Sequence, residues 1–190
     1  VLFIADFASL LRPASLCITL VGIALLVAEI ARLAKDRSFA SRPGFLWAVA
    51  GVGLALAILI DFNRNARFVA WDEFSHWGAI IKMISFSNSA VHLVSQDYSL
   101  YFQDYPPGAA YVAYFFLRLS GFQENVALFS HAVLLMFAAL PAVAASSTFR
   151  PQTVLLVVLA FVIVLLLGQG WSTVLIDQVV GALFGAVLAI

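Results

Sequence analysis

Long apolar runs alternate with polar connections along the whole chain. A helix needs about 20 predominantly apolar residues to cross a lipid bilayer. Candidate spans lie at 13–31, 44–60, 124–145 and 153–167, and a last apolar run extends from 174 to the end. A shorter helix is predicted at 107–119. This pattern predicts an all-α fold, a polytopic transmembrane helical bundle.

The first two connections carry opposite net charge. The connector after the first span holds four basic residues and one acidic residue, so its net charge is +3 and it is expected in the cytoplasm. Arg32 in this region is one turn from Glu29 and is expected to pair with it. Residues 61–105 hold three basic and five acidic residues, a net charge of −2, which predicts a long external loop. Alternation of the spans then places the end of the 107–119 helix, near Arg118, in the cytoplasm.

The external loop contains a predicted amphipathic helix from Phe74 to Phe86. Its apolar residues recur at spacings of three and four, namely Trp77, Ile80, Ile81 and Ile84. We expect this helix to lie in the membrane interface, with Trp71 and Trp77 at the level of the lipid headgroups. Loops of this length are uncommon unless they are functional.

The composition agrees with a membrane protein. The chain is 64% hydrophobic and 11% charged, whereas soluble domains are about 45–50% apolar and about 25% charged. The net charge of +0 gives no reason to expect a nucleic-acid partner. The single Cys17 excludes an internal disulfide and a zinc site built from cysteines. Because the chain begins at Val1 and stops at Ile190 inside an apolar run, we expect residues 1–190 to be a single transmembrane module cut from a longer protein.

Two carboxylates and a histidine stand between two tryptophans in the stretch Trp71-Asp72-Glu73-Phe74-Ser75-His76-Trp77. A positioned carboxylate removes a proton from a nucleophile, so Asp72 and Glu73 are candidate catalytic residues. The same pair also suits the solvated first turn of a helix. His76, four residues after Asp72, is either a packed or interfacial histidine or a functional residue that holds Asp72, donates to phosphate or joins Asp72 in binding a metal ion.

Other polar residues suggest binding roles. Arg64, Arg67 and Lys82 are candidate phosphate binders, and the two arginines suit lipid headgroups as well. Tyr105 is a candidate for stacking on a sugar or shaping a donor groove. Asp177, near the start of the last apolar run, is either a functional carboxylate or a polar contact between helices.

The succession of Asp72-Glu73 and then Tyr105-Pro106-Pro107-Gly108 resembles the GT-C superfamily of membrane glycosyltransferases. This superfamily includes the protein O-mannosyltransferases and the aminoarabinose transferases of lipid A. The resemblance covers roughly residues 44–180, and Asp177 looks similar to the second acidic position of the family. It implies a polyprenyl-phosphate-linked sugar donor and an acceptor on the external face. It also implies a first-loop aspartate that acts as a catalytic base or as a ligand of a divalent metal.

The sequence therefore predicts an inverting glycosyltransferase of the bacterial inner membrane, with a catalytic external loop at about 61–105. Asp72 is the expected base, and Glu73 is the alternative or orients the acceptor. The residues expected to bind substrate are His76, Arg64, Arg67, Lys82, Tyr105 and Asp177. The alternative function is a transporter or flippase of lipid-linked sugars, which would place paired charges in broken helices at the membrane midplane.

The predicted topology contains one conflict. Three crossings, at 107–119, 124–145 and 153–167, would put Asp177 on the opposite side of the membrane from Asp72. Either one of these three segments does not cross, the short 107–119 helix being the first candidate, or the similarity of Asp177 to the family position does not hold.

Overall fold

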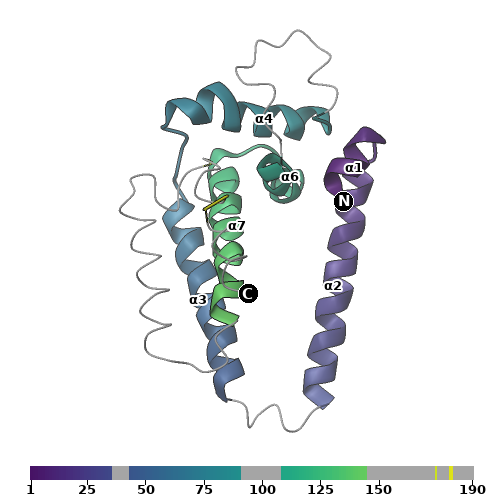
Figure 1. The fold of residues 1–190 in the computed structure, drawn as a ribbon, viewed down its shortest axis with the longest axis vertical. Helices are drawn as coiled ribbons and strands as arrows, with labels where there is room; N and C mark the ends of the chain where they lie inside the picture. The colour runs from purple at the N-terminus through teal and green to yellow at the C-terminus, as the bar shows by residue number, and fades with distance from the viewer. Residues whose placement is uncertain (36–42, 91–107, 145–173, 175–179, 182–190) are drawn as a thin grey trace. The chain divides into compact units, whose positions relative to one another are not determined.

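The computed structural model describes residues 1–35, 43–90, 108–144, 174 and 180–181. It contains the helices α1 (Leu2–Phe7), α2 (Leu11–Lys35), α3 (Pro43–Asn63), the π-helical turn η2 (Glu73–Trp77), α4 (Gly78–Ser87), α6 (Gly108–Ser120) and α7 (Glu124–Ala144) (Figure 1). No strand occurs in these ranges, so the all-α prediction is confirmed for them. The predicted span 153–167 lies outside the described residues. The chain divides into two compact units, Val1–Ile58 and Leu59–Ile190.

In the first unit, α2 has the length and composition of a membrane-crossing helix. Its stretch Leu11–Leu33 is the one helix in the described ranges that is long and apolar enough to cross a bilayer. Leu20, Leu25 and Ile30 are each more than half exposed, so protein does not cover its apolar surface. A helix that is apolar all round needs an apolar environment. The position of α2 agrees with the predicted span 13–31.

The ion pair predicted near the end of this helix is confirmed. The Arg32 guanidinium donates from Nε to Glu29 Oε2 at 2.9 Å and from Nη2 to Glu29 Oε1 at 2.6 Å. The two parallel bonds give the planar, two-point geometry that arginine makes with a carboxylate. In this pair two opposite charges partly neutralise each other at the polar end of an otherwise apolar helix.

The core of the second unit forms where α4 packs on α6 and α7. Ile80, Ile81 and Ile84 on α4 are buried, as are Tyr114 on α6 and Leu128 on α7. The expectation that this helix lies in the membrane interface stays a prediction, because a helix whose apolar face packs on other helices can still lie there. The periodicity of the stripe is as predicted, but neighbouring helices cover it.

The connection from α6 to α7 also differs from the predicted topology. The 13 residues of α6 extend about 20 Å, which is less than the roughly 30 Å of a bilayer core. Gly121 then turns the chain with φ +75. The start of α7 lies against the residues that follow α3, because Asn125 Nδ2 donates to the Arg64 carbonyl at 3.2 Å and the Phe68 N–H donates to Glu124 Oε2 at 3.1 Å. The expectation that the end of α6 lies on the opposite side from the start of the external loop is therefore wrong.

Candidate functional site

The acidic stretch singled out in the sequence forms a π-helical turn. In η2 the Gly78 N–H donates to the Glu73 carbonyl five residues back. A side chain at position 78 would collide with this carbonyl and with the ring of Phe68, so the glycine permits both the wide turn and the close approach of the ring. Single π-helical turns occur frequently at functional sites.

Glu73 is almost fully buried and its carboxylate accepts three backbone N–H groups. Oε2 accepts from Val69 at 2.7 Å and from Ala70 at 2.9 Å, while Oε1 accepts from Val174 at 3.2 Å. The contacts to Val69 and Ala70 are those of a glutamate in the first helical turn that reaches back to the chain entering it. Glu73 is therefore not a solvated helix-start residue, since only 1% of its surface is exposed.

Asp72 differs from Glu73 in both burial and hydrogen bonding. Its side chain is exposed and makes no capping hydrogen bond. It stands between two exposed aromatic side chains, Trp71 at 63% and Phe74 at 59%. Of the two predicted catalytic carboxylates, Asp72 is the one that a substrate approaching from outside the protein would meet.

His76 belongs to the packed side of the same turn. It is 2% exposed, and its ring contacts Trp77 edge to face with centroids 4.4 Å apart. Asp72 is exposed while His76 is buried, which gives no support to their holding a metal ion together. Within the described ranges no three histidine, cysteine, aspartate or glutamate side chains are grouped to hold a metal.

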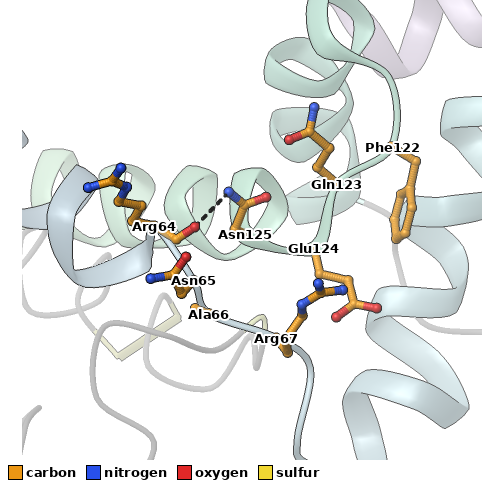
Figure 2. A pocket seen from close by; sticks show the side chains of 8 residues that line it. All are labelled: Arg64, Asn65, Ala66, Arg67, Phe122, Gln123, Glu124 and Asn125. Atoms are coloured by element: carbon orange, nitrogen blue, oxygen red, sulfur yellow. Dashed lines mark hydrogen bonds between the residues drawn. The ribbon is translucent and has the colours of Figure 1, made fainter.

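A polar pocket of about 550 Å³ lies between the segment after α3 and the α6–α7 connection (Figure 2). Its lining consists of Arg64, Asn65, Ala66, Arg67, Phe122, Gln123, Glu124 and Asn125. Both predicted phosphate-binding arginines thus line one cavity. The third predicted cation, Lys82 on α4, lies with its Nζ 5.7 Å from the ring centroid of Phe122. The basic side chains therefore come from two stretches of the chain: Arg64 and Arg67 line the pocket, and Lys82 lies against the ring of Phe122, which also lines it.

Phe68 links this pocket to the acidic turn. Its ring lies edge to face with Phe122 of the pocket at 6.4 Å and with Phe74 of η2 at 6.3 Å. Its backbone N–H is held by Glu124, another residue of the pocket lining. The cationic pocket and the turn that carries Asp72 therefore share one aromatic wall.

Two predicted site residues, Tyr105 and Asp177, lie outside the described residues. The structure also includes residues that the sequence reading did not select. Glu124 and Asn125 join the pocket, and Val174 donates to the acidic turn. A signal for the first two was present, because Gln123-Glu124-Asn125 is a polar cluster at the start of an apolar run.

No protein-family model matches the chain, and no curated protein or solved structure matches it either.

Proposed function

We propose that the protein is a membrane glycosyltransferase of the GT-C type, acting at the external face of a bacterial inner membrane. It transfers a sugar from a polyprenyl-phosphate-linked donor to an acceptor. The observation that carries the proposal is the cationic pocket lined by Arg64 and Arg67, which shares the wall of Phe68 with the turn that exposes Asp72. A phosphate site beside an accessible carboxylate is what this reaction requires.

In the proposed reaction Asp72 removes the proton from the acceptor hydroxyl. A bond forms between the acceptor oxygen and the anomeric carbon, and the bond from that carbon to the phosphate oxygen breaks. Attack from the side opposite the phosphate inverts the anomeric centre. Arg64 and Arg67 stabilise the charge left on the polyprenyl phosphate by charge-assisted hydrogen bonds, and Lys82 contributes to the positive potential.

The proposed membrane arrangement is a polytopic bundle in which α2, α3 and α7 cross the bilayer and α6 does not. Two crossings, at 124–145 and 153–167, then separate the external loop from Asp177. An even number of crossings returns the chain to the side of Asp72, which resolves the conflict in the predicted topology. The hydrogen bond from Val174 to Glu73 supports this arrangement.

The test is transfer of labelled sugar from polyprenyl-phosphate donors by the full-length protein in lipid nanodiscs. Asp72→Asn is expected to lower kcat by about 100-fold or more, because a positioned base contributes about 10²–10⁴ in rate. Asp61→Asn, which neutralises another exposed carboxylate, in the last turn of α3, is the matched control and should leave transfer unchanged. Full activity of Asp72→Asn would contradict the role of Asp72.

The same transfer assay tests the proposed phosphate-binding roles of Arg64 and Arg67. Arg64→Gln and Arg67→Gln are each expected to raise the KM for the donor by about 10- to 150-fold, because charge-assisted hydrogen bonds contribute about 1.5–3 kcal/mol. Movement of the donor across the bilayer without release of polyprenyl phosphate would instead support the transporter or flippase.

A further inference from the structure

Two carboxylates hold the segment of chain that leads into η2. Glu124 accepts the N–H of Phe68, and Glu73 accepts the N–H groups of Val69 and Ala70. Three consecutive backbone donors therefore have side-chain acceptors. Phe68 is buried whereas Val69 is 82% exposed, so burial alone does not hold this segment. Hydrogen bonds to charged carboxylates are stronger than neutral ones, and three in a row fix the path of the chain immediately before Asp72.

The second oxygen of Glu73 has a different role, because it accepts from Val174, 101 positions later in the sequence. Val174 is fully buried. This bond is therefore a long-range contact between the first external loop and the C-terminal part of the chain, and it is shielded from water. A hydrogen bond to a carboxylate is stronger under such conditions than at the surface.

We propose that Glu73 is a positioning residue, whose carboxylate joins the turn carrying Asp72 to the backbone at Val174. The inference rests on the proposed function, in which Asp72 is the base. Both oxygens of Glu73 are occupied and the side chain is buried, so Glu73 does not itself take the proton of the acceptor. It keeps Asp72 at the correct place by tying together two distant parts of the chain.

Glu73→Gln selectively tests the long-range hydrogen bond between Glu73 and the N–H of Val174. The glutamine carbonyl oxygen can still accept from Val69 and Ala70, but its NH₂ group then faces the N–H of Val174, and two donors do not bond. Glu124→Gln is the matched control for hydrogen exchange. It makes the same chemical change, yet its single bond to Phe68 requires only one acceptor oxygen.

The first measurement is backbone hydrogen–deuterium exchange of the full-length protein in nanodiscs. In Glu73→Gln, the amide of Val174 is expected to exchange about tenfold faster or more, while those of Val69 and Ala70 keep their rates. In Glu124→Gln, the amide of Phe68 is expected to keep its rate. Unchanged exchange at Val174 in Glu73→Gln would overturn the inference, whether or not the protein transfers sugar.

The second measurement is transfer kinetics, which separates a positioning role from a purely structural one. Glu73→Gln is expected to lower kcat with little change in KM, and the double variant with Asp72→Asn should be no slower than Asp72→Asn alone. A double variant slower than Asp72→Asn would mean that Glu73 acts independently of Asp72, and would overturn the inference. If Glu73→Gln does not fold, Val174→Pro removes the donor instead and should give the same loss of kcat; normal kcat in that variant would overturn the inference. Absence of transfer in the wild-type protein would refute the proposed function alone, since the exchange result stands without it.

Discussion

Ile84→Ala tests whether the apolar stripe of α4 is covered by protein. Ile84 is fully buried in the unit that α4 forms with α6 and α7. The substitution removes three carbon atoms, each of which contributes about 0.8 kcal/mol when buried. This gives about 2.4 kcal/mol before the cavity is counted, and buried isoleucine-to-alanine changes cost about 2–5 kcal/mol in total. We expect the free energy of unfolding to fall by an amount in that range.

The assay is reversible unfolding of the full-length protein in detergent, compared with Phe86→Ala. Phe86 lies on the same helix but is 70% exposed; because its ring contacts that of Phe122 with centroids 6.3 Å apart, its truncation should lower the free energy of unfolding by about 0.5–1.5 kcal/mol, less than Ile84→Ala. The two variants differ chiefly in whether protein covers the side chain. If Phe86→Ala costs as much as Ile84→Ala, the stripe is not packed as described and the reasoning is refuted.

Two further substitutions test local geometry. Gly78→Ala is expected to lower the free energy of unfolding by about 1–3 kcal/mol, because its new methyl group would overlap the backbone of the π-helical turn. Gly108→Ala, where a methyl group meets nothing within 4 Å, should be neutral in the same unfolding assay, and equal effects would contradict the close contact at Gly78. Tyr114→Phe removes the 2.8 Å hydrogen bond to Asn88 Oδ1 and should cost about 0.5–1.5 kcal/mol in equilibrium unfolding. Because Asn88 is exposed and can bond to water, a loss above this range would show that the tyrosine has another role.

Periodicity and charge along the chain predicted the elements better than their surroundings. The first span and the Glu29–Arg32 pair follow from local sequence, since length, apolarity and a spacing of one helical turn suffice to predict them. The stripe of α4 was also correctly located. What covers it was not, because periodicity identifies an apolar face without showing whether lipid or another helix lies against it.

In the candidate site, too, the sequence identified residues but not the contacts that they make in the fold. The sequence favoured Asp72 as the base, with Glu73 as the alternative or as orienting the acceptor, and this preference came from the family resemblance more than from local patterns. The separation of their roles depends on the burial of Glu73 and on its donor at Val174, a residue far away in the sequence. Arg64 and Arg67 were selected for their charge, but the cavity that they line also needs the start of α7 beside them.

The bond between Glu73 and Val174 also sets an order of events during synthesis. A ribosome adds about 5–20 residues per second, so the 101 positions between the two residues take roughly 5–20 s to make. During that interval one oxygen of the carboxylate has no backbone donor, and burying it would be unfavourable. The acidic turn is therefore expected to stay hydrated and open on the nascent chain. It closes only after the last part of this sequence has emerged, so a ribosome that stalls before position 174 leaves a protein whose first loop is unfinished.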